Sequence, residues 1–156
     1  MTSPSAPMVG VHDDASGLGR LLATVLKEKL GEAPWKEGVV RGLPRRAVRL
    51  VTPDTEQSAT IITGIGELAI TGSEDLEPDV TVTLSSRSVP LLLKIDSGPA
   101  HLPVLWGGGG LALLKSILTR EVKVRGLVTH LILVIRVLQL LSVPRPEQAA
   151  SARSAA

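Results

Sequence analysis

The apolar positions of this chain recur first at helical spacing and then at alternating spacing. Between Ser16 and Gly31, leucine and valine return every three or four residues while charged side chains take the other face, which predicts an amphipathic helix with Ser16 as its N-cap. The period then becomes two, which predicts strands. The predicted strands cover residues 47–52, 58–63, 67–71 and 79–85. Short turns separate the first three, so we expect an antiparallel meander.

The second half of the chain continues with helices and one further strand. A helix capped by Ser88 is predicted over residues 88–95, and another begins near Leu111. Residues 121–125 alternate as the last strand, and residues 127–143 predict a helix that is apolar almost all round. This order of elements predicts an α+β domain whose antiparallel sheet is covered by helices on one face.

The last predicted helix poses the main question. A helix with so wide an apolar surface is either buried on several sides or covers something that is not protein. Residues 127–143 span roughly 25 Å as a helix, less than the hydrocarbon core of about 30 Å. Thr129, Arg136 and Gln139 fall within one sector of the helical wheel and predict a solvent-facing stripe. The sequence therefore favours the closing helix of a domain over a membrane span.

Composition narrows the classes of partner. The 156 residues suit one domain, and 44% are hydrophobic with a mean hydropathy of +0.27. Phe and Tyr are absent, so the interior must be aliphatic, and rings for stacking bases are scarce. The net charge of +2 is also too small to indicate a nucleic-acid partner. The absence of Cys excludes disulfides and thiolate ligands and is compatible with a reducing cytoplasm.

Both ends of the sequence are expected to be disordered tails. Residues 1–15 are rich in Ser, Pro, Ala and Asp, and residues 144–156 are mostly small. Residues 1–7 also lack the basic start and apolar run of a secretion signal, so we expect a cytoplasmic protein. The predicted folded domain covers residues 16–143.

Two segments of the chain resemble a known family. Residues 79–87 read DVTVTLSSR, a strand that runs into a short helix, and residues 121–126 read EVKVRG, a strand that turns into a Leu-rich helix. Their order and endings resemble the sterol carrier protein 2-like (SCP2-like) domain family, over roughly residues 18–141. The resemblance implies about five mostly antiparallel strands, layered with helices around an apolar tunnel for fatty acyl chains, sterols or similar lipids. The missing Phe and a Gly107–Gly110 run depart from the family's pattern.

A lipid-lining wall follows from this resemblance together with the apolar pattern. The expected lining residues are Val80, Val82, Leu84, Leu114, Ile117, Leu118, Leu131, Val134, Ile135, Leu138 and Leu141. The expected function is a non-catalytic carrier that sequesters a hydrophobic small molecule such as a sterol, fatty acyl or isoprenoid chain. The alternative is an accessory or scaffold protein, for example in quinone or lipid metabolism, whose last helix docks a partner, a membrane surface or a second copy in a homodimer.

Residues with catalytic or ligand chemistry are few. The Gly107–Gly110 run precedes a predicted helix but lacks the Lys and Ser or Thr of a phosphate loop, so we expect a hinge or lid. Residues 12–14 read HDD, too few ligands for a metal and inside the predicted tail. His101 lies in a Pro-flanked loop, and we expect His130 to hydrogen-bond a neighbour. No G-x-S-x-G turn occurs, so we expect no enzyme, cofactor or metal.

Basic residues cluster after the first predicted helix. They are Arg41, Arg45, Arg46 and Arg49. One interpretation is an ordinary solvated face. The other is a docking patch for anionic lipid headgroups, with each arginine contributing about 1 kcal/mol near such a surface. Because a lipid carrier must visit membranes, the second interpretation predicts a protein peripheral to the membrane.

Overall fold

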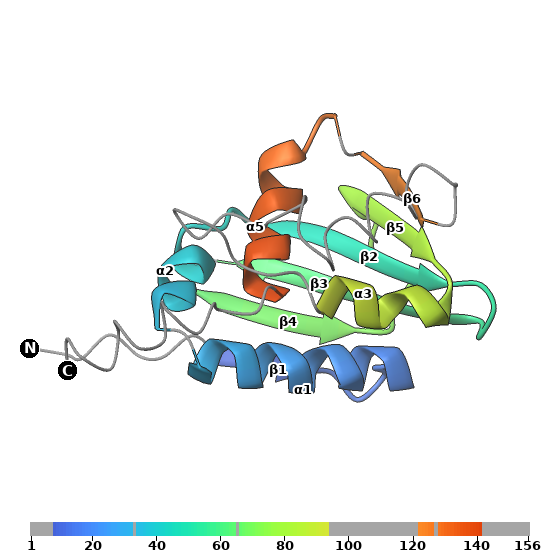
Figure 1. The fold of residues 1–156 in the computed structure, drawn as a ribbon, viewed down its shortest axis with the longest axis horizontal. Coiled ribbons are helices and arrows are strands. Elements are labelled where there is room, and N and C mark those ends of the chain that lie inside the picture. The colour runs from blue at the N-terminus through green and yellow to red at the C-terminus, as the bar shows by residue number, and fades with distance from the viewer. Residues whose placement is uncertain (1–7, 33, 65, 94–121, 127, 142–156) are drawn as a thin grey trace, which may run out of the picture.

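The computed structural model describes residues 8–32, 34–64, 66–93, 122–126 and 128–141 (Figure 1). The helical segments are α1 (Gly17–Glu32), α2 (Trp35–Arg41), the 3-10 turn η1 (Ser86–Ser88), α3 (Val89–Leu93) and α5 (Leu131–Leu141). The strands are β1 (Met8–Val11), β2 (Arg46–Thr52), β3 (Gln57–Gly64), β4 (Glu67–Thr71), β5 (Val80–Leu84) and β6 (Val122–Arg125). The Gly107–Gly110 run, the helix expected from Leu111 and the predicted tail over residues 144–156 lie outside the described residues.

The described strands form one mixed sheet in the order β1-β4-β3-β2-β5-β6. β2, β3 and β4 form the antiparallel meander that the short turns predict. β5 pairs parallel to β2 and antiparallel to β6, and β1 pairs parallel to β4. The α+β class is confirmed, but the expectation of about five mostly antiparallel strands is wrong in both respects: the sheet has six strands in the described part and is mixed.

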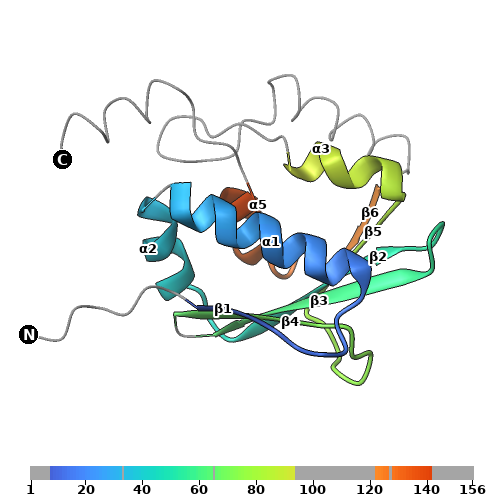
Figure 2. The ribbon, with the colours of Figure 1, turned by 90° about the horizontal axis from the view of Figure 1, so that it is seen from below.

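The parallel pairing of β5 comes from a connection longer than a hairpin turn. Residues 72–79 carry the chain from β4 past β3 and β2, so that β5 joins the far side of β2 in the same direction. Arg49 of β2 donates hydrogen bonds to the carbonyl groups of Glu74 and Leu76 in this connection. The connection therefore runs over the sheet face that the helices leave open (Figure 2).

Residues 8–15 belong to the domain, although the sequence placed residues 1–15 in a tail. β1 extends the sheet at one edge, and the backbone N–H of His12 continues the pairing with β4 at 2.9 Å. The hydroxyl of Thr71 donates to a carboxylate oxygen of Asp14 at 2.7 Å, and this hydrogen bond is the main cause of a lowered pKa of Asp14. Composition suggested disorder because it does not show that a neighbouring strand offers hydrogen-bond partners.

The helices of the described residues all lie on one face of the sheet (Figure 2). Alternation along β2 turns Val48 and Leu50 toward the helices and Arg49 toward the other face. Val48 lies opposite Ile61 of β3 and beside Val80 of β5 in register. These side chains are buried, so the apolar faces of the central strands align into one core beneath the helices.

α1 confirms the first predicted helix and its cap. The hydroxyl of Ser16 accepts a hydrogen bond from the N–H of Gly19 at 3.2 Å, and Oε1 of Gln57 accepts one from the N–H of Leu18 at 2.8 Å. A Cβ atom on Gly19 would lie 3.3 Å from Cγ2 of Ile70, so this glycine permits a close approach of helix to sheet. α1 therefore packs directly on β1, β3 and β4.

Candidate functional site

α5 lies on the helical side of the sheet between α2 and α3, and contacts α1, α2 and α3 (Figure 1). It begins at Leu131, four residues later than predicted. Leu133, Val137 and Leu140 form its buried side and belong to the core. None of the helices in the described ranges combines the length and apolar character that a bilayer span requires.

The stripe predicted to face solvent on this helix is only partly correct. Arg136 and Thr129 are exposed, but Gln139 is only 4% exposed. Gln139 lies in the last turn of α5, where neighbouring Leu140 and Leu141 are also buried. The helical wheel fails here because the end of α5 is enclosed by other parts of the chain, which the period of one helix does not show.

The lining residues predicted on α5 share one side of the helix, within about 120° on the helical wheel. They are Leu131, Val134, Ile135, Leu138 and Leu141. Leu141 is buried, Leu131 is exposed, and the three between them are half-buried. Val134 and Leu138 pack against the buried core. This side of α5 is therefore neither filled core nor open surface along most of its length.

The lining residues predicted on β5 divide in the same way. Val80 and Leu84 are each 1% exposed and belong to the filled core, whereas Val82 between them is half-buried. Val82 lies opposite Val124 of β6, and both pack against the core from its margin, as Leu93 of α3 does. The remaining predicted lining residues lie outside the described residues: Leu114, Ile117 and Leu118.

Five half-buried aliphatic side chains thus border the core at β5, β6, α3 and α5. They are Val82, Leu93, Val124, Val134 and Leu138, and we call them the apolar wall. β5 and β6 form the sheet edge opposite β1, and α3 contacts α5 among the helices (Figure 1). The apolar wall carries no charge or hydrogen-bonding side chain, so what it can do chemically is to remove apolar surface from water.

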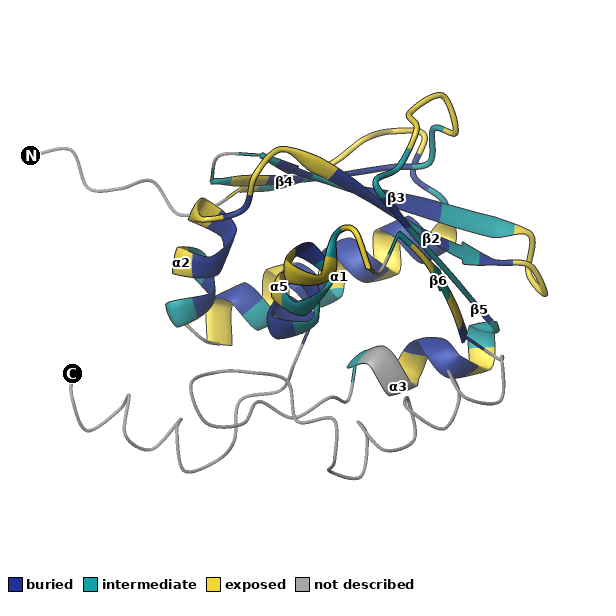
Figure 3. Cartoon of the chain, turned by 90° about the horizontal axis from the view of Figure 1, so that it is seen from above, coloured by how far each residue is buried: buried dark blue, intermediate teal, exposed yellow. Residues whose placement is uncertain are grey.

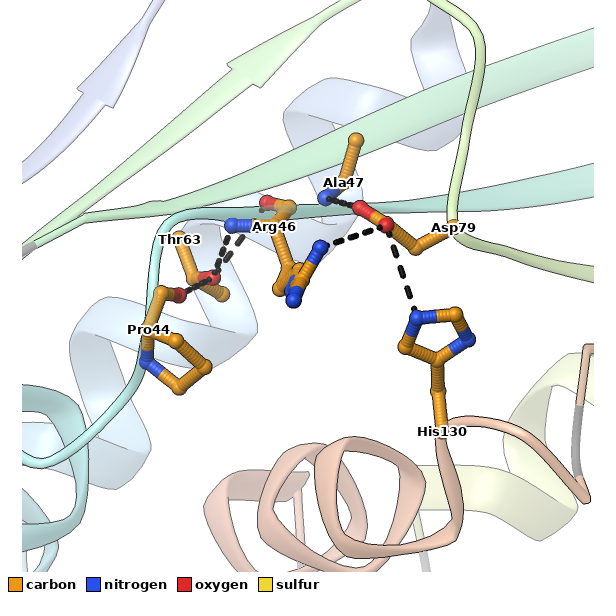
Figure 4. Close-up of polar contacts among 6 residues, drawn as sticks. All are labelled: Pro44, Arg46, Ala47, Thr63, Asp79 and His130. Atoms are coloured by element: carbon orange, nitrogen blue, oxygen red, sulfur yellow. Dashed lines mark hydrogen bonds and ion pairs between the residues drawn. The ribbon is translucent and has the colours of Figure 1, made fainter.

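Asp79 fastens the start of α5 to the sheet (Figure 4). Its Oδ2 accepts the backbone N–H of Ala47 at 2.9 Å, and its Oδ1 accepts Nη1 of Arg46 at 3.2 Å. Nε2 of His130, the residue before α5, lies 3.6 Å from the same Oδ1. Nδ1 of this ring is buried and has no hydrogen-bond partner in the described part of the chain. His130 therefore lies beside Asp79, but the hydrogen bond expected of its ring is not formed in the described part of the chain.

Gly126 makes this attachment possible. Its φ of +84° lies in the left-handed region that favours glycine, and a Cβ atom there would lie 2.4 Å from the carbonyl oxygen of Asp79. The carbonyl group of Gly126 also accepts the N–H of His130 at 3.0 Å. The turn from β6 into α5 is therefore seated directly against the start of β5.

Lys36 provides a polar contact at the other end of α5. Its side chain is fully buried, and its Nζ donates to the carbonyl oxygen of Leu140 at 2.9 Å and lies 5.6 Å from the ring centroid of Trp35. The last carbonyl groups of a helix lack partners within it and carry partial negative charge, so a cation stabilises them. Burial lowers the pKa of Lys36 from 10.5 to about 8. Sequence reasoning missed Lys36, because the pattern of one short helix does not distinguish it from a surface lysine.

We expect the free energy of unfolding to rise as the pH increases from about 8 to 10.5. In that window the folded protein has lost the Lys36 proton while the unfolded chain retains it, so the unfolded state binds more protons and stability increases with pH. Each pKa unit corresponds to about 1.4 kcal/mol, which gives an upper value of roughly 3 kcal/mol. The chain has no Tyr and no Cys, so lysines are the side chains that titrate there.

Urea unfolding at several pH values checks this prediction. Lys36→Met keeps the length of the side chain and removes its titration, so the alkaline rise should disappear. Lys27→Met, at an exposed position on α1, should retain it. An equal rise in the two variants would show that Lys36 is not the group responsible.

The structure does not gather the four arginines of the predicted docking patch on one face. They are Arg41, Arg45, Arg46 and Arg49. Arg46 and Arg49 lie three residues apart on β2 and therefore point to opposite faces of the sheet. Arg46 pairs with Asp79, and Nη2 of Arg41 lies 3.6 Å from Oε2 of Glu37 within α2. Arg45 is exposed. Much of this charge is matched by internal contacts.

A cavity of about 240 Å³ opens between the start of α1 and the η1–α3 segment. Its lining is mixed, with Leu18 and Val89 beside Thr52, Gln57 and Ser86. Thr52 and Gln57 are already hydrogen-bonded to neighbouring backbone. Sequence pattern alone did not predict this cavity, because its lining comes from separate segments. The polar groups in its mixed lining suit an acyl chain less well than the aliphatic side chains of the apolar wall.

Comparison with known proteins reveals the fold but no close relative. The solved structure described as "UbiJ-SCP2 Ubiquinone synthesis protein" is similar with a TM-score of 0.58 and 15% identity, over 80% of this chain and 92% of that one. A sec-alkylsulfatase, Pisa1 from Pseudomonas sp., gives a TM-score of 0.38 and 20% identity, over 65% of this chain and 12% of that one. No family model and no curated protein matches. The chain therefore has an SCP2-like fold.

Proposed function

We propose that this protein binds a hydrophobic small molecule without catalysis, through burial of apolar surface against the apolar wall. The ligand class is a fatty acyl, sterol or isoprenoid chain. Burial contributes about 0.8 kcal/mol for each CH₂ group of the ligand that is removed from water. Aliphatic side chains alone can therefore bind a hydrocarbon chain. The proposal involves no cofactor, metal or nucleic acid, and it places the protein in the cytoplasm, in transient contact with membranes.

The observation that carries the proposal is the seating of α5 within an SCP2-like fold. Polar contacts hold both ends of this helix, through Asp79 and His130 at the start and Lys36 at the end. Between them, Val134 and Leu138 are only half-buried. A filled core would cover this side completely, whereas a surface helix would carry polar residues there. An apolar ligand accounts for both features.

A second candidate is an accessory role in quinone biosynthesis. It is favoured by the name of the structurally similar protein, which describes ubiquinone synthesis. In this version the protein presents an isoprenoid compound to an enzyme, and the same wall holds the isoprenoid tail. A third arrangement, in which α5 pairs two copies into a homodimer with a filled core, predicts no ligand.

Native mass spectrometry separates these arrangements. We expect the purified protein to carry a non-covalent lipid that is released on collisional activation, and the delipidated protein to take up one fatty acid or isoprenoid per chain. The mass of the retained lipid distinguishes a fatty acid from an isoprenoid quinone. An empty dimer that takes up neither compound would contradict the proposal.

A further inference from the structure

The turn after β6 and the first residues of α5 carry the two most exposed large apolar side chains in the described part of the chain. Val128 is 95% exposed and Ile132 is 75% exposed, and Leu131 beside them is 51% exposed. We call these three residues the apolar tip. The turn projects beyond the sheet at the top of Figure 1, and Figure 3 shows exposed residues at the same place. Three neighbouring exposed apolar side chains at a projecting turn are the starting point for a binding surface.

Exposed positive charges flank the apolar tip along the chain. Residues 122–141 contain no Asp and no Glu. Arg125 is exposed at the end of β6, directly before the turn. Arg136 is exposed one turn after Ile132 on the same side of α5. The negative charge of Asp79, at the base of the tip, is paired with Arg46 at 3.2 Å. An aliphatic tip flanked by cations is complementary to an apolar layer that lies beneath anionic headgroups.

We propose that the apolar tip inserts into the surface of an anionic lipid bilayer, with Arg125 and Arg136 at the headgroups. Three projecting side chains are too few for a stable protein interface, which needs about 800 Å² on each partner. A bilayer requires no such matched area, because it encloses a small tip from all sides. Leu131 of the tip lies on the same side of α5 as Val134 and Leu138 of the apolar wall.

This continuity extends the proposed function. A ligand that leaves the bilayer at the tip would meet the apolar wall within the next two turns of α5. The tip itself is argued from exposure and charge alone, so its test does not depend on ligand uptake. In this proposal the apolar tip, and not the four arginines of the predicted docking patch, is the surface that contacts the membrane.

Vesicle flotation of the full chain tests the tip. We expect binding to vesicles of phosphatidylcholine with phosphatidylglycerol, and weaker binding to phosphatidylcholine alone or at high salt. Val128→Ser combined with Ile132→Ser should lower the partition coefficient roughly tenfold. Arg125→Gln combined with Arg136→Gln should remove the preference for anionic vesicles. Met8→Ser, at a 65% exposed position on the opposite sheet edge, is the matched control and should bind as the wild type does.

Fatty-acid uptake without vesicles, measured on the same variants, keeps the two proposals apart. If the Val128 and Ile132 double variant floats weakly but takes up fatty acid normally, the result supports membrane insertion of the tip. Three results would contradict membrane insertion of the tip. The double variant could float as well as the wild type, or Met8→Ser could lose as much binding. The wild type could also fail to bind vesicles and instead form a dimer in sedimentation. A wild type that floats through the tip but takes up no lipid would support the tip and overturn the carrier function.

Discussion

Replacing Leu138 by arginine is expected to abolish uptake of a fluorescent fatty acid, with far-ultraviolet circular dichroism close to that of the wild type. Leu138 is half-buried in the apolar wall and packs against the core from α5. A guanidinium group there would lose its water when a ligand covers it, at a cost of several kcal/mol that apolar contacts cannot recover. A fluorescence titration of the delipidated protein measures the loss.

Ile132→Arg is the matched control, because it makes the same chemical change on the same helix at a position that is 75% exposed. It should leave uptake in vesicle-free solution unchanged. Leu138→Ala provides a milder variant that is decisive even where the arginine variant fails to fold, and it should weaken uptake by roughly tenfold. Wild-type uptake by the folded Leu138 variants would show that α5 does not contact the ligand.

Replacing Gly126 by alanine is expected to lower the free energy of unfolding by about 2–4 kcal/mol. The positive φ of Gly126 already disfavours a side chain, and the added Cβ atom would collide with the carbonyl oxygen of Asp79. The turn must therefore move away from the start of β5. That movement separates His130 from Asp79, so ligand uptake should fall together with stability. Urea unfolding and the fluorescence titration measure the two effects.

Gly31→Ala is the control for the intrinsic effect of the substitution. Gly31 lies in the last turn of α1, and a Cβ atom there would meet nothing within 4 Å. Alanine should therefore stabilise the protein by about 0.5–1 kcal/mol. A Gly126→Ala variant as stable as the wild type would show that close contact at this turn does not fix the start of α5.

Local pattern was sufficient to predict most single elements of the fold. The spacing after Ser16 predicted α1 and its cap, and alternation predicted β2 to β5 within a few residues. These predictions succeeded because each depends on one face of one element being buried. The resemblance of residues 79–87 and 121–126 to SCP2-like proteins agrees with the fold that the structural comparison shows.

Partners between distant segments could not be predicted in the same way. Alternation in β5 fits a parallel or an antiparallel neighbour equally, so its pairing with β2 depends on where residues 72–79 place it. β1 reads as a tail because it is mostly exposed and is held in the sheet by its backbone pairing with β4. Lys36 and Gln139 read as surface residues, yet both are buried near the end of α5. The environment of each of these elements and residues is set by segments that are distant in the sequence.

In the candidate site, too, the local pattern was predictable and the contacts between distant segments were not. The sequence placed Val134 and Leu138 on one side of the last helix and Val82 on the inner side of its strand, and the structure finds all three at the margin of one core. It could not separate them from Val80 and Leu84, which share the same strand face but are filled core. Only the arrangement of α5 over the sheet distinguishes the wall from the core.

The central claim is that an apolar ligand lies against the apolar wall. Photo-crosslinking with a diazirine fatty acid, followed by mass spectrometry of the labelled peptides, tests it most directly. We expect labels on the peptides of β5, β6 and α5, with Val82, Val124 and Leu138 among the labelled positions, and we expect an excess of unlabelled fatty acid to abolish them. Labels confined to the open face of the sheet, or labels that the competitor does not reduce, would contradict the claim.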